Sequence, residues 1–328
     1  MIYMTLSKPI RLALVGFVVT ALAALVFTVN RSKLNEDEDY PVALTSAPSL
    51  PLKGVTLDTP YDIGKAVSVI KSHNSRLTVR LVMDSGVPVA DYKKAVDALS
   101  PHANIMIEVL DSEELSDHSA DWIRTRTEQA FKAMGDKVSI WEIGNELNGE
   151  WTGSSPREIN AKAKAAYDVV KKHGGRTALT LNYWSSSDCY THDWESTLSY
   201  GRTLRNDFSK IDYVFLSVYE TVCTPRQHPS AQDLSKTLKS LGEFFPNAYL
   251  GIGEVGAQRP EDEGVAEPDF AEKNRLANYY YGMHGQMKNA VGSRYAGGYF
   301  WWYFRQDAVD APAAQSLWPS IREQLKKM

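Results

Sequence analysis

Residues 138–151 read VSIWEIGNELNGEW, an apolar run of strand-forming residues that closes on carboxylates, amides and tryptophans. Carboxylates are costly to desolvate, so their place at the end of a buried strand calls for a physical reason. Runs of the same kind recur along the chain, and most of them also end on an acid. We expect eight strands, at residues 54–58, 77–84, 104–111, 139–146, 177–184, 212–220, 248–254 and 297–304.

Helical patterns alternate with these runs. Thr59-Pro60 and Ser155-Pro156 each offer a capping hydroxyl followed by proline, which is a typical start of a helix. Hydrophobic strands separated by single helices predict a parallel sheet that is covered on both faces. Eight such units favour closure into a (β/α)8 TIM barrel, in which functional residues gather at the C-terminal ends of the strands. A dinucleotide-binding sheet is disfavoured, because no G-x-G-x-x-G follows the first strand.

The amino terminus differs from the rest of the chain. Residues 12–29 carry no charge and have Lys and Arg on both flanks, so they are expected to act as a membrane anchor or a cleaved signal peptide. The division that we expect is a signal or anchor at 1–33, a linker at 34–51 and a catalytic barrel at 52–328. We expect the barrel to lie outside the cytoplasm, as a periplasmic protein, as a protein anchored in the inner membrane, or as a secreted protein.

Charge and cysteine content narrow the partners and the compartment. The formal net charge is −4 and no basic stripe occurs, so a nucleic acid partner is not expected. The chain has two cysteines, Cys189 and Cys223, which follow the fifth and sixth expected strands. In an exported protein such a pair predicts a disulfide that pins two adjacent loops, the alternative being two unrelated buried thiols.

Acidic residues stand at or just after nearly every expected strand end. In a dry cavity such a ring requires raised pKa values or counter-ions. The histidines are scattered and no His-x-His occurs on an early strand, so we expect no catalytic metal; the sixth and seventh strands lack the inward lysine of a Schiff-base enzyme. We also expect no cofactor. The acids are Asp58, Asp84, Glu108, Asp111, Glu146, Glu150, Asp188, Glu220, Glu254 and Asp307.

Two carboxyl groups suffice for glycoside hydrolysis when one is protonated and the other ionised. Aromatic rings provide the faces on which the apolar side of a sugar can stack. Six of the eight tryptophans lie in or just after strand-end segments, and this favours a carbohydrate site. They are Trp141, Trp151, Trp184, Trp194, Trp301 and Trp302.

Two segments carry a resemblance to a known group of enzymes. WEIGNELNGEW (141–151) resembles the acid/base segment of the retaining glycoside hydrolases of clan A, and LGIGEVGA (250–257) resembles the nucleophile segment of the same clan. The resemblance implies that Glu146 is the general acid/base and Glu254 the nucleophile of a retaining O-glycosyl hydrolase. Families 39 and 5 are the most similar, and SVYETVC (217–223) with FPNAYLGIGEVGA (245–257) resembles bacterial exopolysaccharide hydrolases.

Further roles follow from the same resemblance. It implies that Asn145 binds the 2-hydroxyl of the substrate, that Tyr219 supports the nucleophile and that Arg80 keeps it ionised. Trp301 or Trp302 would form the platform under the reacting sugar; strand alternation lets only one face inward, and we favour Trp301. Trp151 and Trp184 are further candidates for substrate binding. The chain departs from the pattern at Leu147, where proline is common, and at Ser217, where histidine is common.

The physical division of labour can be stated from the residues. Arg80 near Glu254 is expected to lower the pKa of that carboxyl, while the surroundings of Glu146 are expected to raise its pKa. Double displacement on a β-linked polysaccharide, with endo action preferred, is the expected reaction, and it requires the carboxyl groups to lie about 5–5.5 Å apart. Glu142 competes with Glu146 for the acid/base role. The alternative functions are a catalytically silent carbohydrate-binding barrel in a polysaccharide synthesis or secretion assembly, and a metal- or lysine-dependent barrel enzyme.

Overall fold

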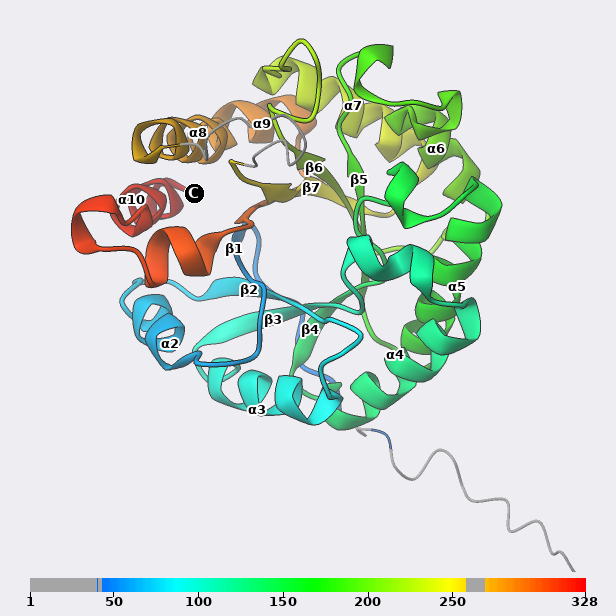
Figure 1. The fold of residues 1–328 in the computed structure, drawn as a ribbon, viewed down its shortest axis with the longest axis horizontal. Coiled ribbons are helices and arrows are strands. Elements are labelled where there is room, and N and C mark those ends of the chain that lie inside the picture. The colour runs from blue at the N-terminus through cyan, green and yellow to red at the C-terminus, as the bar shows by residue number, and fades with distance from the viewer. Residues whose placement is uncertain (1–39, 41–42, 258–268) are drawn as a thin grey trace, which may run out of the picture. The chain divides into compact units, whose positions relative to one another are not determined.

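The computed structural model describes residues 40, 43–257 and 269–328. Eight parallel strands pair in chain order and close into a barrel, with β8 next to β1 (Figure 1). The expected TIM barrel and its eight strands are thereby confirmed. The strands are β1 (Leu52–Leu57), β2 (Leu77–Val82), β3 (Ala103–Glu108), β4 (Val138–Glu142), β5 (Thr177–Asn182), β6 (Tyr213–Val218), β7 (Tyr249–Val255) and β8 (Tyr295–Trp301).

Helices surround the barrel and cover its outer face (Figure 1). They pack on the outward-facing side chains of the strands; for example, the ring of Phe131 stacks on Trp141 at 5.1 Å between centroids. The helices are α2 (Gly64–Lys71), α3 (Val89–Leu99), α4 (Ala120–Met134), α5 (Pro156–Lys172), α6 (Thr197–Leu204), α7 (Ala231–Phe244), α8 (Phe270–Gly282), α9 (His284–Val291) and α10 (Trp318–Lys327).

Inside the barrel the side chains form two layers. Because successive residues of a strand point to opposite faces, every second residue is directed inward. Toward the N-terminal ends of the strands the inward residues form one apolar cluster, called here the lower layer. Further along the strands the inward positions become polar, beginning with Arg80 on β2. The lower layer consists of Leu52, Met106, Ile140, Ala178, Tyr213, Phe215, Ala296 and Phe300.

The two expected helix starts have different outcomes. α5 begins as expected, with Pro156 as its first residue and the Ser155 hydroxyl accepting a hydrogen bond from the Glu158 amide at 3.4 Å. The start expected at Thr59-Pro60 is wrong, because α2 begins only at Gly64 and has no side-chain cap. The Thr59 hydroxyl instead accepts a hydrogen bond from the Tyr61 amide, which forms a turn before the helix.

Glycine permits the closest approach in the barrel wall, between β7 and β8. Gly298 has φ +110°, and a Cβ atom placed there would lie 2.0 Å from the carbonyl oxygen of Ile252. An alanine at this position would clash with the neighbouring backbone and would also adopt a strained conformation. The two strands therefore approach this closely because residue 298 has no side chain.

The predicted anchor or signal segment, residues 12–29, lies outside the described residues. Within the part of the chain that is described, no helix is both long and apolar enough to cross a membrane. The described part of the expected linker contacts the barrel domain. The ring of Tyr40 stacks on His173 with centroids 3.7 Å apart, and Arg176 Nη1 donates a hydrogen bond to the Thr45 carbonyl at 3.0 Å.

Candidate active site

The polar interior of the barrel is organised around Arg80, which is fully buried on β2. Its Nε donates to Glu142 Oε2 at 2.6 Å and its Nη1 to Glu254 Oε2 at 2.6 Å. Its Nη2 lies 2.5 Å from Glu108 Oε2. One guanidinium thus contacts three carboxyl groups, and these four residues are called the Arg80 cluster below.

Glu254 lies on β7 and receives more donors than the other carboxyls of the cluster. In addition to Arg80, the Tyr219 hydroxyl donates to Glu254 Oε1 at 2.5 Å. The side-chain amide of Asn145 donates to Glu254 Oε2 at 3.2 Å. Three sequence-predicted residues, Arg80, Asn145 and Tyr219, therefore converge on this one carboxylate.

Glu146 lies in the turn after β4, in a backbone conformation with φ +50°. This conformation is uncommon for a residue with a side chain, and such strain persists where the surrounding structure enforces it. The Ser217 hydroxyl donates to Glu146 Oε1 at 2.5 Å. Because Ser217 pairs in register with Glu254 between β6 and β7, it brings the Glu146 carboxyl to the same end of the barrel as Glu254.

The environments of the two glutamates differ, although burial dominates both. Burial raises the pKa of Glu146 well above its ordinary value, and the nearby charge of Glu254 adds to this. Burial also raises the pKa of Glu254, while Arg80 and then Tyr219 counteract it. Arg80 thus lowers the pKa of Glu254 as expected, but burial outweighs this effect, so the net direction for Glu254 is upward and not downward. The two carboxyls differ in their direct partners, since Glu254 contacts Arg80 whereas Glu146 accepts from the Ser217 hydroxyl.

The competing candidate, Glu142, has a different position. It is the last residue of β4 and is fully buried. Its two carboxyl oxygens contact Arg80 and the hydroxyl of Thr180. Glu142 thus belongs to the layer below Glu146, and its contacts within the barrel fit a structural partner of Arg80 better than a proton donor to a substrate.

Of the two tryptophans at the end of β8, it is Trp302 that faces the barrel interior. Its ring lies over the Arg80 guanidinium, with 5.4 Å from Cζ to the ring centroid. Trp301 is fully buried in the hydrophobic core that surrounds the barrel, and its indole N–H donates to Asp307 at 3.0 Å. The preference for Trp301 is therefore wrong, and the inward ring belongs to Trp302, the first residue after the strand.

The other tryptophans divide between the core and the loops. Trp141 is buried against Phe131 and belongs to the core. Trp151 and Trp184 are partly buried, and the indole nitrogen of each has no hydrogen-bond partner among the residues that the structure describes. Trp194 packs against the core and its ring is stacked near that of His192. Two buried indole N–H groups, in the loops that follow β4 and β5, are thus unpaired among the described residues.

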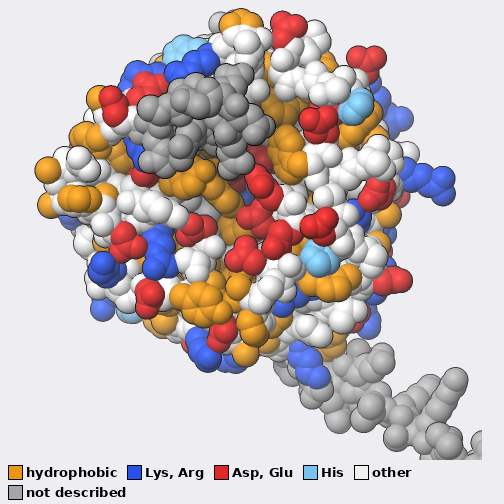
Figure 2. Space-filling model, in the orientation of Figure 1, with side chains coloured by type: hydrophobic (Ala, Val, Ile, Leu, Met, Phe, Trp, Pro, Cys, Tyr) orange, Lys and Arg blue, Asp and Glu red, His pale blue; other side chains and the backbone are white. Residues whose placement is uncertain are grey.

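Acidic side chains gather at the centre of the face seen in Figure 2. Among the acids at strand ends, burial and then the charges of Asp111 and Glu114 raise the pKa of Asp84 to about 6. Burial likewise raises the pKa of Asp111 and of Glu108. These directions agree with the expectation that so many acids cannot all ionise at their ordinary pKa values.

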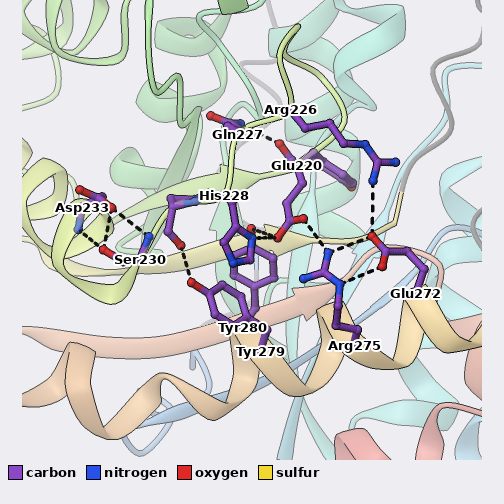
Figure 3. A network of polar contacts seen from close by, with 12 residues as sticks. Glu220, Arg226, Gln227, His228, Ser230, Asp233, Glu272, Arg275, Tyr279 and Tyr280 are labelled. Atoms are coloured by element: carbon purple, nitrogen blue, oxygen red, sulfur yellow. Dashed lines mark hydrogen bonds and ion pairs between the residues drawn. The ribbon is translucent and has the colours of Figure 1, made fainter.

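The loops beside the site are held by covalent and ionic links. Cys189 and Cys223 form the expected disulfide, with their Cα atoms 4.4 Å apart. Just after Tyr219, the carboxylate of Glu220 contacts His228 Nδ1 at 2.6 Å and Arg275 Nη2 at 2.7 Å (Figure 3). Since Arg275 lies on α8, this network joins the loop after β6 to that helix.

Three residues outside the Arg80 cluster could together hold a metal ion. Among the described residues, donor atoms of Glu150, His192 and Glu195 lie within 4.8 Å of one another. The side chains of Glu150 and His192 are 54% and 53% exposed. Neither Glu146 nor Glu254 belongs to this group, so the chemistry proposed below does not depend on it.

Three functional neighbours were missed by the sequence reasoning. Ser217 was noted only as a departure from the histidine of similar enzymes, yet it binds Glu146. Glu108 was counted only among the strand-end acids, and Thr180 was not singled out. All three occupy inward positions on their strands. Aligning neighbouring strands so that Arg80 points inward would therefore have identified them.

Comparisons with known proteins support the fold. No protein-family model matches the chain. No curated protein matches it either. Among solved structures, the AHE enzyme from Alicyclobacillus herbarius is 12% identical with a TM-score of 0.53, covering 79% of this chain and 90% of its own. The mannohexaose complex of Thermomonospora fusca β-mannanase is 16% identical with a TM-score of 0.51, covering 82% of each chain. The family 1 β-glucosidase from Thermotoga maritima is 13% identical with a TM-score of 0.50, covering 74% and 77%.

Proposed function

We propose that the protein is a retaining glycoside hydrolase that cleaves a β-linked polysaccharide, with Glu254 as nucleophile and Glu146 as general acid/base. The observation that carries this proposal is the pair of buried glutamates with unlike partners. Glu254 accepts hydrogen bonds from Arg80, Tyr219 and Asn145, whereas Glu146 accepts one from Ser217. Two carboxyls at one barrel end with different proton affinities are what a double displacement requires.

The reaction proceeds by two successive displacements at the anomeric carbon. Glu254 attacks the anomeric carbon while Glu146 donates its proton to the leaving glycosidic oxygen, which forms a glycosyl-enzyme ester and releases the first product. Glu146, now ionised, takes a proton from water, and this water attacks the anomeric carbon and frees Glu254. The second displacement restores the original anomeric configuration. Tyr219 and Arg80 stabilise the negative charge that returns to Glu254 when it leaves.

Several polar and aromatic groups are placed to hold the sugar. The buried Oδ1 of Asn145 has no hydrogen-bond partner among the described residues, so it remains available to a sugar hydroxyl. Trp302 offers an aromatic face over Arg80, suited to stacking on the sugar at the cleavage point. Trp151 and Trp184 offer indole donors for sugars further along the chain.

The substrate class is proposed from two sources. Solved structures of similar fold include a β-mannanase with bound mannohexaose, which supports a β-linked polysaccharide and endo action. The resemblance of residues 217–223 and 245–257 to exopolysaccharide hydrolases supports an exopolysaccharide as the substrate. Export is part of the proposal, supported by the disulfide and by the charge-free stretch at residues 12–29. Sequencing the amino terminus of the mature protein distinguishes a retained anchor from a cleaved signal.

The pH dependence of activity follows from the two glutamates. The active form requires Glu254 ionised and Glu146 protonated. As pH rises, kcat/KM first increases when Glu254 loses its proton, and later decreases when Glu146 loses its proton. Since burial raises both pKa values, the acidic limb lies above the ordinary pKa of a glutamate. A profile whose acidic limb lies below the ordinary glutamate pKa would contradict this assignment.

The proposal is tested by a screen against β-linked polysaccharides. Purified protein is incubated with each glycan, and new reducing ends are measured alongside glycan binding. Release of reducing ends by the native protein, and not by a Glu254→Gln variant that still binds, supports the proposal. Binding without release by the native protein on every glycan would favour the silent carbohydrate-binding barrel instead.

A further inference from the structure

The Arg80 cluster contains more acid than base. The guanidinium of Arg80 lies within 2.6 Å of an oxygen of Glu108, Glu142 and Glu254, and each of these side chains is 4% exposed or less. Within the residues that the structure describes, no other lysine or arginine is ion-paired with these three carboxyls. Full ionisation would leave two uncompensated negative charges without solvent, which is very costly. At least one of the three carboxyls therefore carries a proton.

The hydrogen-bond donors indicate where the proton is held. Glu254 accepts from Tyr219 and Asn145 in addition to Arg80, and Glu142 accepts from the Thr180 hydroxyl. The oxygens of Glu108 have no hydrogen-bond partner among the described residues, so its contact with Arg80 is its ion pair at 2.5 Å. Donors stabilise the ionised form of a carboxyl, and the carboxyl with the fewest donors keeps the proton most readily.

The charges that surround Glu108 act in the same direction. Arg80 is the cation that faces it, while Glu142, Asp111 and Glu254 are acids that face it from β4, from the loop after β3 and from β7. Burial, opposed by Arg80 and aided by these acids, raises the pKa of Glu108 well above its ordinary value. The excess of acidic groups, the small number of hydrogen-bond donors and the surrounding charges thus all indicate that Glu108 holds the proton.

We propose that Glu108 is a neutral carboxylic acid at neutral pH and acts as a positioning residue for the nucleophile. Its Oε2 lies 2.5 Å from Nη2 of Arg80 and helps to fix the guanidinium plane, while its neutrality leaves the positive charge of Arg80 to Glu142 and Glu254. An ionised Glu108 would add a negative charge beside Glu254 and would favour the protonated, non-nucleophilic form of that residue. The consequence for the nucleophile rests on the proposed function, whereas the proton on Glu108 does not.

The protonation state of Glu108 can be measured without any substrate. The protein is labelled with ¹³C at the side-chain carboxyl of glutamate, and the signal absent from the Glu108→Gln spectrum is assigned to Glu108. At pH 7 this signal is expected at the chemical shift of a protonated acid. A signal at the shift of an ionised carboxylate overturns the proposal, whatever the enzymatic activity proves to be.

The positioning role is tested by three variants and a pH profile. Glu108→Ala removes the oxygen that contacts Arg80 and is expected to lower kcat/KM, and Glu108→Gln, which keeps a neutral carbonyl oxygen, is expected to recover most of this loss. Glu108→Gln should also keep the acidic limb at the pH of the native protein. The matched variant Glu142→Gln removes a charge that raises the pKa of Glu254, so its acidic limb should move to lower pH. An equal downward shift in Glu108→Gln, or no recovery over alanine, would show that Glu108 does not act as a neutral partner of Arg80.

Discussion

The barrel interior contains two adjacent layers of buried side chains. The lower layer is apolar, whereas the layer above it, called the upper layer here, consists of the charged Arg80 cluster. In the lower layer, Phe215 and Phe300 pack against aliphatic and aromatic neighbours. One layer further along the strands, Arg80 contacts three glutamates at similar burial. Burying apolar area stabilises the fold, whereas burying charge costs stability unless every charge is paired. This difference fits the proposed function, in which the upper layer carries the chemistry and the lower layer supports it.

The largest expected effect separates activity from stability at Glu254. Glu254→Gln removes the nucleophile, so kcat/KM should fall by about 10⁴-fold or more. The free energy of unfolding, measured in urea at pH 7, should not decrease, because the variant removes a buried negative charge from a cluster that has too many. Activity within tenfold of the native protein would exclude Glu254 as the nucleophile.

A substitution of Arg80 tests whether the upper layer depends on the one cation that pairs with its glutamates among the described residues. Arg80→Met leaves the buried carboxyls without a counter-ion, so we expect a loss of about 3–5 kcal/mol in the free energy of unfolding at pH 7. Lys93→Met removes an exposed ion pair with Asp97 and serves as a control that should cost less than about 1 kcal/mol. Equal losses in the two variants would contradict the described role of Arg80.

Tyr219 sharpens the assignment of Glu254 as the ionised partner. Tyr219→Phe removes a donor worth about 1.5–3 kcal/mol to a charged acceptor, which corresponds to a loss of about 10- to 100-fold in kcat/KM. Since the lost donor favoured the ionised form, the acidic limb of the profile should move to higher pH. Tyr213→Phe, a matched change in the lower layer, should alter neither quantity. A limb that moves to lower pH in Tyr219→Phe would argue against this contact.

The smallest effect concerns the lower layer. Phe215→Leu changes the shape of a fully buried apolar side chain and should lower the free energy of unfolding by about 1–1.5 kcal/mol. The value of kcat/KM at a temperature well below unfolding should stay near that of the native protein. A larger loss of activity than of stability would show that the two layers are not separable.

The sequence predicted those features that depend on order along the chain. Alternation of eight apolar runs with helices is enough to specify the barrel, and the strand-end rule placed Glu146 and Glu254 at one end. Arg80 and Tyr219 were matched to Glu254 through the resemblance, and the structure shows both contacts. The cysteines were paired because consecutive loops of a barrel are neighbours.

The remaining features depend on inward or outward direction, which the sequence leaves ambiguous. On β8 both faces are aromatic, with Tyr299 and Trp301 outside and Phe300 inside, so hydrophobic alternation gave no signal for choosing between Trp301 and Trp302. A register irregularity between Lys53 and Val55 in the pairing with β8 adds to this ambiguity. The sharing of Arg80 among three acids was missed for a similar reason, because it depends on the relative register of four strands, β2, β3, β4 and β7.

The stereochemistry of the first product tests the central claim most directly. A polysaccharide cleaved by the protein is followed by ¹H NMR from the start of the reaction, before the new reducing end equilibrates between anomers. Attack by Glu254 and then by water predicts that the β-anomer appears first from a β-linked substrate. Initial appearance of the α-anomer would show a single displacement and would contradict the pairing of Glu146 and Glu254 described here.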